Sequence, residues 1–152
     1  YLVYVRAKGY IYKDTLIHIP NAAAELTYTI PLSALQKEMV LQLRNIQFDH
    51  NSSVLTTSSY AELDKLVKLM QDNPSMQIEL SAHTDDVGSE QYNMRLSQQR
   101  GESVRKYLIR KGVDAKRIIA KGYGKNKPLV PNDSDENRAI NRRVEFTINE
   151  IE

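Results

Sequence analysis

The most consequential absence from this chain of 152 residues is cysteine. Without cysteine the protein forms no disulfide and offers no thiolate to a metal ion, and the redox compartment is left open. Long apolar runs are also missing, because no stretch reaches the roughly 18 residues typical of a membrane-spanning helix. Neither sign of charge dominates, since 21 basic and 19 acidic residues leave a net charge of +2. That charge is too small to indicate nucleic acid as the main partner.

The start of the chain carries no secretory signal. Because it begins at Tyr1 and not at methionine, we expect a piece of a longer protein whose signal or anchor lies upstream. What is present is an ordinary globular composition, with 41% hydrophobic and 26% charged residues. The length predicts one domain with a short appendage and is sufficient to bury a core.

Residues 1–35 differ in character from the rest of the chain. They contain β-rich runs separated by turn residues such as Gly9 and Pro20, with few large apolar side chains. The strand-like runs cover residues 2–5, 10–12, 16–19 and 25–32. We predict that this segment is a linker, the tail of a preceding β module, or an edge hairpin docked on the main domain. The composition changes near Pro31, so the main domain is expected to occupy residues 36–152.

The main domain alternates between strand and helix patterns. Predicted strands cover residues 40–48, 76–82, 117–120 and 143–148, and predicted helices cover residues 56–71, 91–111 and 133–140. The run at 122–133 is rich in glycine, proline and asparagine and is predicted to be a loop. The order predicts an α/β two-layer sandwich, with a βαβαβ core, a mixed sheet, a short extra helix and a final strand. The first strand–helix–strand unit is expected to have parallel strands.

Local signals mark the ends of the first two helices. Ser59 and Glu62 have the spacing of a capping box at the start of the first helix, and Pro74 follows its end. Gly112 follows the second helix at the position where a glycine commonly terminates a helix. These signals support the predicted boundaries.

One arginine interrupts the apolar stripe of the second helix. Leu96, Arg100 and Val104 recur at helical spacing, so Arg100 falls on the side predicted to face the core. An unpaired guanidinium there would cost on the order of several kcal/mol by desolvation. Arg100 therefore needs an anion, and the nearest acidic candidates are Asp85 and Asp86 in the preceding loop.

Two interpretations of this arrangement stay open. In the first, the acid and Arg100 form an internal salt bridge that ties the loop to the helix. In the second, Asp85 and Arg100 flank a pocket, where the carboxylate takes a ligand ammonium and the guanidinium takes a ligand carboxylate in a forked geometry. Backbone amides near residues 89–92, at the start of the helix, would add positive potential. Such a pocket would hold an amino-acid head group.

The motifs around these residues resemble the OmpA-like C-terminal domain, the peptidoglycan-binding module of outer-membrane proteins, peptidoglycan-associated lipoproteins and flagellar stator proteins. The matching elements are, in order, Asn45-Ile46-x-Phe48-Asp49, Ser53-x-Leu55, Leu63, His83-Thr84-Asp85-x-x-Gly88, Asn93-x-x-Leu96-Ser97-x-x-Arg100, Val104, Gly112, Gly122-Tyr123-Gly124, Pro128, Asn132 and Arg138-x-x-Asn141-Arg142-Arg143-Val144-Glu145. No single element is decisive, but the series across roughly residues 40–150 is highly specific.

The resemblance implies non-catalytic binding of peptidoglycan through the diaminopimelate residue of its stem peptide. It implies a periplasmic protein attached to the outer membrane of a Gram-negative cell, where it anchors that membrane to the wall. Asp85 is expected to contact the ligand ammonium and Arg100 the ligand carboxylate. Further ligand-binding residues implied by the resemblance are Thr84, Asn93, Phe48, Asp49 and Arg143. The alternative that Arg142 and Arg143 only hold the last strand and nearby loops stays open.

The sequence departs from the family pattern at two positions. Ala82 stands where glycine usually precedes the His-Thr-Asp motif, and Gly101 stands where alanine usually follows the helical arginine. A glycine inside a helix costs about 1 kcal/mol relative to alanine. Neither position carries a proposed charge, so we expect binding to survive.

Nothing in the chain predicts catalysis, a cofactor or a resident metal. His83 stands near two acids, but the other histidines complete no metal motif with it, so a structural histidine at a strand end is favoured. No nucleophile elbow or phosphate loop accompanies the acids. The lysines in residues 121–127 are interpreted as a solvated face.

Two functions from different classes therefore stay open. The first is a non-catalytic module that binds peptidoglycan. The second is a structural or assembly domain, in which Asp85 and Arg100 form an internal salt bridge and the N-terminal strands mediate contacts. A homo-oligomer is compatible with both, and neither nucleic-acid binding nor membrane insertion by this fragment is predicted.

Overall fold

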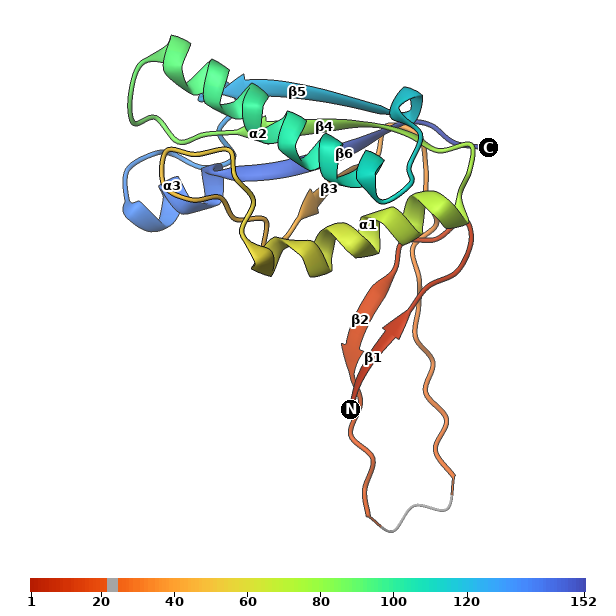
Figure 1. Ribbon diagram of the computed structural model, residues 1–152. Helices are drawn as coiled ribbons and strands as arrows, with labels where there is room; N and C mark the ends of the chain where they lie inside the picture. Colours follow the sequence, from red (N-terminus) through yellow and green to blue (C-terminus); the bar gives the residue numbers. More distant parts are fainter. Residues whose placement is uncertain (22–24) are drawn as a thin grey trace.

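The computed structural model describes residues 1–21 and 25–152. Its main body is a four-stranded mixed sheet covered by helices, from which an N-terminal arm projects (Figure 1). The sheet has the order β3-β6-β4-β5 and consists of β3 (Val40–Leu43), β4 (Gln77–His83), β5 (Ile118–Gly124) and β6 (Arg143–Glu150). The predicted α/β two-layer sandwich is confirmed.

The last strand of the chain lies inside the sheet. β6 pairs antiparallel with both β3 and β4, whereas β4 pairs parallel with β5. β3 and β4 consequently run in the same direction, as predicted, but β6 separates them. The inner face of β6 consists of Val144, Phe146 and Ile148, all buried. This apolar row suits a strand that has neighbours on both sides.

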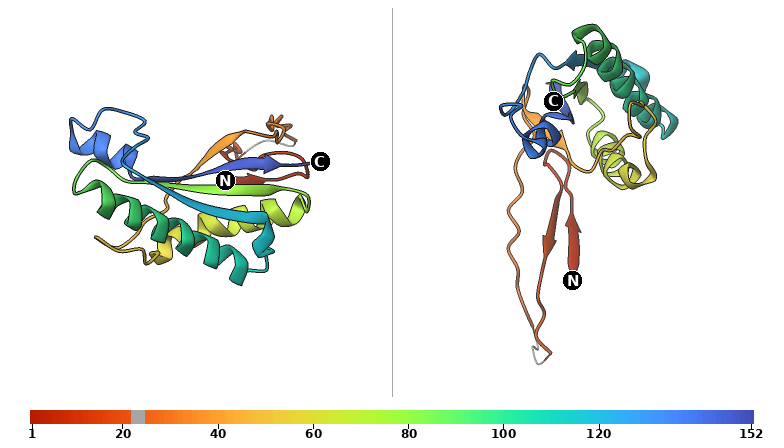
Figure 2. Two further views of the ribbon diagram at one scale, coloured as in Figure 1. Left: turned by 90° about the horizontal axis from the view of Figure 1, so that it is seen from above. Right: turned by 90° about the vertical axis from the view of Figure 1, so that its left-hand side faces the viewer.

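The two long helices cover one face of the sheet. Helices α1 (Tyr60–Asp72) and α2 (Glu90–Arg110) lie side by side against that face (Figure 2), and the short α3 (Asp135–Asn141) sits at the end of the sheet where β6 begins. The largest fully buried apolar side chains are Leu63, Leu66, Met70, Met76, Ile78, Leu80, Val104, Leu108 and Ile148. Apart from Met76, which directly precedes β4, they come from the two helices and the sheet, so one core joins the two layers.

The start of α1 differs from the prediction. A short 3₁₀ turn (Thr57–Ser59) precedes it, and Ser59 has helical backbone angles (φ −76°, ψ −21°) with no cap hydrogen bond from its side chain. Instead the Ser59 hydroxyl accepts from the Gln47 N–H at 2.8 Å and donates to the Gln47 carbonyl at 3.1 Å. Glu62 accepts a hydrogen bond from the Tyr12 hydroxyl at 3.0 Å. The predicted capping box is therefore wrong, because both side chains bind segments that precede the helix.

The first strand of the main domain is shorter than predicted. β3 ends at Leu43, and Asn45 adopts a left-handed backbone (φ 58°), which turns the chain away from β6. Phe48 then pairs with Leu55 in an isolated bridge that closes a loop. This early departure of the chain from the sheet leaves room for the cavity described below.

β5 is longer than predicted and runs through two glycines assigned above to a loop. A Cβ atom on Gly122 would lie 2.3 Å from the backbone nitrogen of Gln98, so only glycine permits α2 to approach so closely. The Gly122 N–H donates to Gln98 Oε1 at 2.8 Å, and the Gly124 N–H donates to the Ser97 hydroxyl at 2.9 Å. The glycines therefore mark a helix–strand contact.

The two departures from the family pattern lie against each other in this contact layer. A Cβ atom on Gly101 would lie 3.8 Å from the Cβ of Ala82 and 3.6 Å from that of Ala120. Gly101 on the helix therefore lacks a methyl group at the point where Ala82 on the facing strand carries one. Both distances are ordinary van der Waals contacts, so an alanine at residue 101 would fit.

The remaining helix ends follow their local signals. Ser89 caps α2 by accepting from the Tyr92 N–H at 3.2 Å, and Ser134 caps α3 in the same way. Gly112 has a φ of 102°, and the following Val113 N–H donates to the Leu108 carbonyl at 3.1 Å. The prediction that glycine terminates α2 is confirmed.

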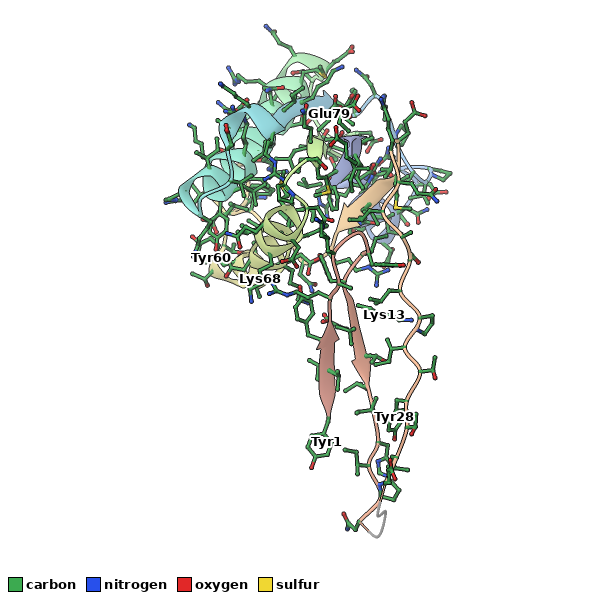
Figure 3. The ribbon with its side chains drawn as sticks, turned by 90° about the vertical axis from the view of Figure 1, so that its right-hand side faces the viewer. Tyr1, Lys13, Tyr28, Tyr60, Lys68 and Glu79 are labelled. Carbon is green, nitrogen blue, oxygen red and sulfur yellow. The ribbon has the colours of Figure 1, made fainter. Side chains whose placement is uncertain are left out.

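The N-terminal arm is built on a hairpin of β1 (Leu2–Val5) and β2 (Lys13–Leu16), which pair antiparallel. Its turn rests on the main body, where the Gly9 N–H donates to Asn73 Oδ1 at 2.8 Å. Leu35 returns the chain to the core and is buried. Figure 3 shows Tyr1 and Tyr28 on the arm, away from the main body.

The arm has fewer strands than the sequence pattern predicted. β2 ends at Leu16, and within the described residues the runs 16–19 and 25–32 form no strand of their own. Residues 10–12 contribute a single bridge, between Tyr10 and Ala34. Residues 22–24 of the predicted N-terminal segment lie outside the described residues.

Candidate functional site

The loop between β4 and α2 is held in place by its own polar groups. The Thr84 N–H donates to the Gly124 carbonyl at 2.9 Å, which fixes the point where the loop leaves the sheet. Asp85 Oδ1 accepts from the Val87 N–H at 3.0 Å, and the buried Asn93 amide donates to the Val87 carbonyl at 2.9 Å. The Asp85 carboxylate is consequently presented at a defined position above the end of β4.

Asp85 is paired with an arginine other than the expected one. Its Oδ2 atom lies 2.6 Å from Nη1 of Arg142, at the junction between α3 and β6, and its side chain is only 13% exposed. Within the described ranges Arg100 makes no ion pair inside 4 Å. The internal salt bridge between Asp85 and Arg100 considered above is therefore not formed.

Arg100 is held beside the loop that follows β3. Its Nε donates to the Ser52 carbonyl at 2.9 Å, and its guanidinium carbon lies 4.9 Å from the centre of the Phe48 ring. Burial lowers the pKa of Arg100, while the charge of Asp85 acts in the opposite direction. The carbonyl and the ring fix the plane of a partly desolvated guanidinium.

A cavity of about 620 Å³ opens beside these groups. Its lining comes from the end of β3 and the loop that follows it, and from the α3–β6 junction on the other side. Its lining includes Phe48 and four arginines, namely Arg44, Arg100, Arg142 and Arg143. Among the described residues that line it there is no acidic side chain, so the cavity favours anionic groups.

The remaining candidates occupy different positions around this cavity. Arg143 is buried, and its guanidinium binds Glu145, the Asn141 carbonyl at 3.2 Å and the Lys127 carbonyl at 3.0 Å. Asp49 is exposed, in the loop that carries Ser52. Arg143 thus has internal partners that hold the start of β6, whereas Asp49 has access to solvent.

Two groups at the site were not predicted from the sequence, the Arg142 side chain and the Ser52 carbonyl. Arg142 was noted only as one of a pair, and which arginine of the pair faces Asp85 depends on where α3 ends. The neighbouring Asp86, the other acidic candidate, is exposed and is bound to Arg138 at 3.1 Å. No sequence signal distinguishes a carbonyl such as that of Ser52 from its neighbours.

His83 forms part of the cavity wall without a polar partner. It is 4% exposed, and in the described structure neither ring nitrogen has a hydrogen-bond partner. Its ring stacks on Tyr123 with centroids 5.3 Å apart. Burial, assisted by the charge of Arg143, lowers the pKa of His83 to about 4. The imidazole is therefore neutral at physiological pH.

We expect this buried imidazole to make the protein sensitive to mild acid. The unfolded chain has a histidine pKa of about 6.5 and binds a proton before the folded chain does, so stability is full above that value and falls as the pH drops towards 4. The loss is on the order of 3 kcal/mol across this window. Urea unfolding from pH 7.5 to 4.5, with His83→Phe as the control, measures it; parallel pH curves for the two proteins would contradict it.

The described part of the chain, residues 1–21 and 25–152, contains no group of three histidine, aspartate or glutamate side chains that could hold a metal ion. Within the same ranges, no helix combines the length and the apolarity needed to cross a bilayer.

Comparisons with known proteins agree on one family. The sequence profile of the OmpA family matches residues 47–142. Outer membrane porin F from Pseudomonas aeruginosa is 35% identical over 136 residues, which cover 89% of this chain and 39% of the porin. The structure of a MotB-like protein from Desulfovibrio vulgaris has a TM-score of 0.66 and 33% identity, covering 74% of this chain and 73% of that protein. The structure of the peptidoglycan-associated lipoprotein from Burkholderia pseudomallei has a TM-score of 0.63 and 28% identity, and the match covers 72% of this chain and 88% of the lipoprotein.

The chain thus spans well under half the length of porin F. None of these matches indicates a catalytic family. The profile match includes the loop and helix that carry Asp85 and Arg100. This chain belongs to the OmpA family.

Proposed function

We propose that this chain binds peptidoglycan without cleaving it, by holding the side-chain end of diaminopimelate between Asp85 and Arg100. The observation that carries the proposal is that Arg100 lines the cavity while Asp85 is bound to another lining residue, Arg142, so the acid and the base lie beside one cavity without pairing with each other. The name of the Burkholderia pseudomallei lipoprotein, which describes it as peptidoglycan-associated, supports this choice of ligand class.

The Arg142–Asp85 pair supports the assignment of the ammonium subsite. The guanidinium of Arg142 already lies 2.6 Å from the Asp85 carboxylate, so the position beside this carboxylate accepts a cation. A ligand ammonium would take the place of Arg142, whose side chain is 46% exposed and therefore free to move into solvent. Binding at this position is thus an exchange of one cation for another.

Arg100 supplies the complementary subsite for the ligand carboxylate. Its Nε is bound to the Ser52 carbonyl, and no hydrogen bond from Nη1 or Nη2 is found within the described residues. These two terminal nitrogens can grip a carboxylate in the forked geometry that gives arginine its selectivity. The ring of Phe48 limits the movement of the guanidinium and excludes water from one face.

The other predicted residues take supporting roles in this proposal. Asn93 and Thr84 hold the loop that presents Asp85. Arg143 lines the cavity and holds the start of β6. Asp49 is exposed in the loop after β3 and is not part of the cavity lining.

We further propose that residues 36–152 form the binding domain and that residues 1–35 join it to a preceding part of a longer protein. The Leu35 side chain is in the core, whereas much of the arm lies outside it. The name of outer membrane porin F supports attachment to the outer membrane, and a domain that binds the wall would lie on the periplasmic side of that membrane. Such a protein would anchor that membrane to the wall.

A purely structural role is the second candidate. The pairing of Asp85 with Arg142 favours it, because this contact ties the β4–α2 loop to the start of β6 without a ligand. Incubation with purified sacculi distinguishes the two functions: a binding module sediments with them, and a structural domain stays in the supernatant. Release of soluble fragments from the sacculi would instead indicate an enzyme.

Titration with free amino acids tests whether the protein binds the carboxylate at the side-chain end of diaminopimelate. We expect lysine to compete at least tenfold less well than diaminopimelate, because its side chain ends in an ammonium without the carboxylate that Arg100 would bind. Isothermal titration calorimetry at millimolar ligand measures both affinities. Equal potency of the two amino acids would exclude the role given to Arg100.

A further inference from the structure

The cavity beside Arg100 is larger and more cationic than one amino-acid head group requires. At about 620 Å³ it lies within the usual range for sites that bind a whole small molecule. Its lining extends from Arg100 past the loop after β3 to Arg44 and across to the α3–β6 junction. The ligand therefore has room to enter the cavity beyond its side-chain end.

The charges on the wall are not balanced within the protein. Arg143 is neutralised by Glu145, and Arg142 by Asp85. In the described structure neither Arg44 nor Arg100 has an acid within 4 Å. The proposed head group accounts for one of these two arginines and leaves Arg44 without an assigned anion.

We propose that the cavity holds a second carboxylate of the ligand between Arg44 and Arg142, an inference that rests on the proposed function. The ligand ammonium displaces Arg142 from Asp85, so the guanidinium is released when the second carboxylate arrives. The internal ion pair between Asp85 and Arg142 is thus replaced by two ligand contacts: the ligand ammonium binds Asp85, and the second ligand carboxylate binds Arg142.

The wall behind these arginines increases the strength of such contacts. The apolar side chains of Leu43, Ala82 and Val144 line the cavity and are buried. His83 lies beside them and has no hydrogen-bond partner among the described residues. Apolar groups on this part of the wall lower the dielectric beside them, so a carboxylate held against them is bound more strongly than at a fully open surface.

The stem peptide offers two carboxylates of this kind. One is the C-terminal carboxylate of a peptide that ends at diaminopimelate, and the other is the α-carboxylate of the γ-linked D-glutamate that precedes it. Both lie within one residue of the head group at Asp85 and Arg100. The shared chemistry is a second carboxylate, and selective amidation identifies which one is bound.

The experiment compares three synthetic tripeptides of alanine, γ-glutamate and diaminopimelate in calorimetric titrations. One is unmodified, one is amidated at the C-terminus, and one is amidated at the glutamate α-carboxylate. For the native protein we expect one of the two amides to bind about tenfold more weakly than the unmodified peptide. In Arg44→Gln the affinity for the unmodified peptide should fall to the level of that weaker amide, and the two peptides should then bind equally well.

Arg110→Gln is the matched control, because Arg110 is an exposed arginine in the last turn of α2, outside the cavity lining. This variant should retain the difference in affinity between the unmodified peptide and the weaker amide. If both amides bind as tightly as the unmodified peptide, or if Arg44→Gln keeps the difference, the second subsite is excluded while the proposed function stands. If none of the three peptides binds, the proposed function fails, and this inference fails with it.

Discussion

Alanine at Asp85 or at Arg100 is expected to lower the affinity for peptidoglycan at least a hundredfold. Each substitution removes one half of the contact to a zwitterionic end and leaves the opposite charge of the ligand desolvated and unpaired. Truncating one partner of a buried, hydrogen-bonded charge pair costs about 2–5 kcal/mol. Sedimentation with purified sacculi at several protein concentrations measures the loss, and calorimetry with diaminopimelate measures it for the isolated head group.

Two neighbouring substitutions serve as matched controls for this prediction. Asp86→Ala removes the adjacent acid, which is exposed and bound to Arg138. Arg95→Ala removes an exposed arginine of the same helix, whose guanidinium lies 6.0 Å from the Tyr92 ring. Both controls should sediment like the native protein. Sedimentation of the Asp85 and Arg100 variants at the native level would show that the pocket lies elsewhere.

Folding must be checked separately, because Asp85 also holds its loop. Its Oδ1 accepts the Val87 N–H and its Oδ2 binds Arg142, so Asp85→Ala loosens two internal contacts besides the proposed ligand contact. Asp85→Asn keeps the shape of the side chain and an acceptor for Val87 but removes the negative charge. It should lose binding nearly as completely as Asp85→Ala while it unfolds at a higher temperature.

The position of Arg100 could be predicted from the sequence because helical periodicity is a local property. The steps of four between Leu96, Arg100 and Val104 place all three on one side of a helix, whatever the rest of the chain does. The neighbouring Leu96 and Val104 are indeed buried, and Arg100 is half-buried beside them. Local spacing was therefore enough to find the unusual charge.

The partner of Asp85 could not be predicted in this way. Arg142 lies 57 residues further along the chain and reaches the loop only because β6 inserts between β3 and β4. The order of strands in a sheet is fixed by long-range pairing, for which a single sequence carries little signal. The internal salt bridge considered for Asp85 and Arg100 assumed that an acid in the loop just before the helix is also the partner of Arg100 in space.

The assignment of residues 122–124 to a loop, where β5 in fact continues, has a different cause. Glycines in a sequence indicate a turn and a close backbone approach equally well, and composition does not distinguish the two. The approach of α2 at Ser97 and Gln98 uses Gly122 as a point of contact, so the strand continues where a loop was predicted. The same contact aligns the helix that carries Arg100.

Alanine at Gly122 should therefore be the most destabilising single-methyl change in the domain. Its Cβ would meet the Gln98 nitrogen at 2.3 Å and the Gln98 Cα at 2.7 Å, and because these are backbone atoms, the helix itself must shift. Overpacking of this kind costs about 3 kcal/mol. The shift would also weaken the hydrogen bond from the Gly122 N–H to Gln98 Oε1, now 2.8 Å long. Urea unfolding followed by circular dichroism measures the change.

Gly101 provides the matched control, since it receives the same added methyl group on the other side of this contact layer. Its Cβ would lie 3.6 Å from the Ala120 Cβ and 3.8 Å from the Ala82 Cβ, in ordinary contact, and its backbone is helical. Gly101→Ala should therefore stabilise the protein by about 1 kcal/mol, through the higher helix propensity of alanine. Opposite signs for the two variants are the expected result. Equal destabilisation would show that the layer between α2 and β5 has no spare room at either position, whereas two neutral effects would show that α2 does not approach β5 as closely as Gly122 permits.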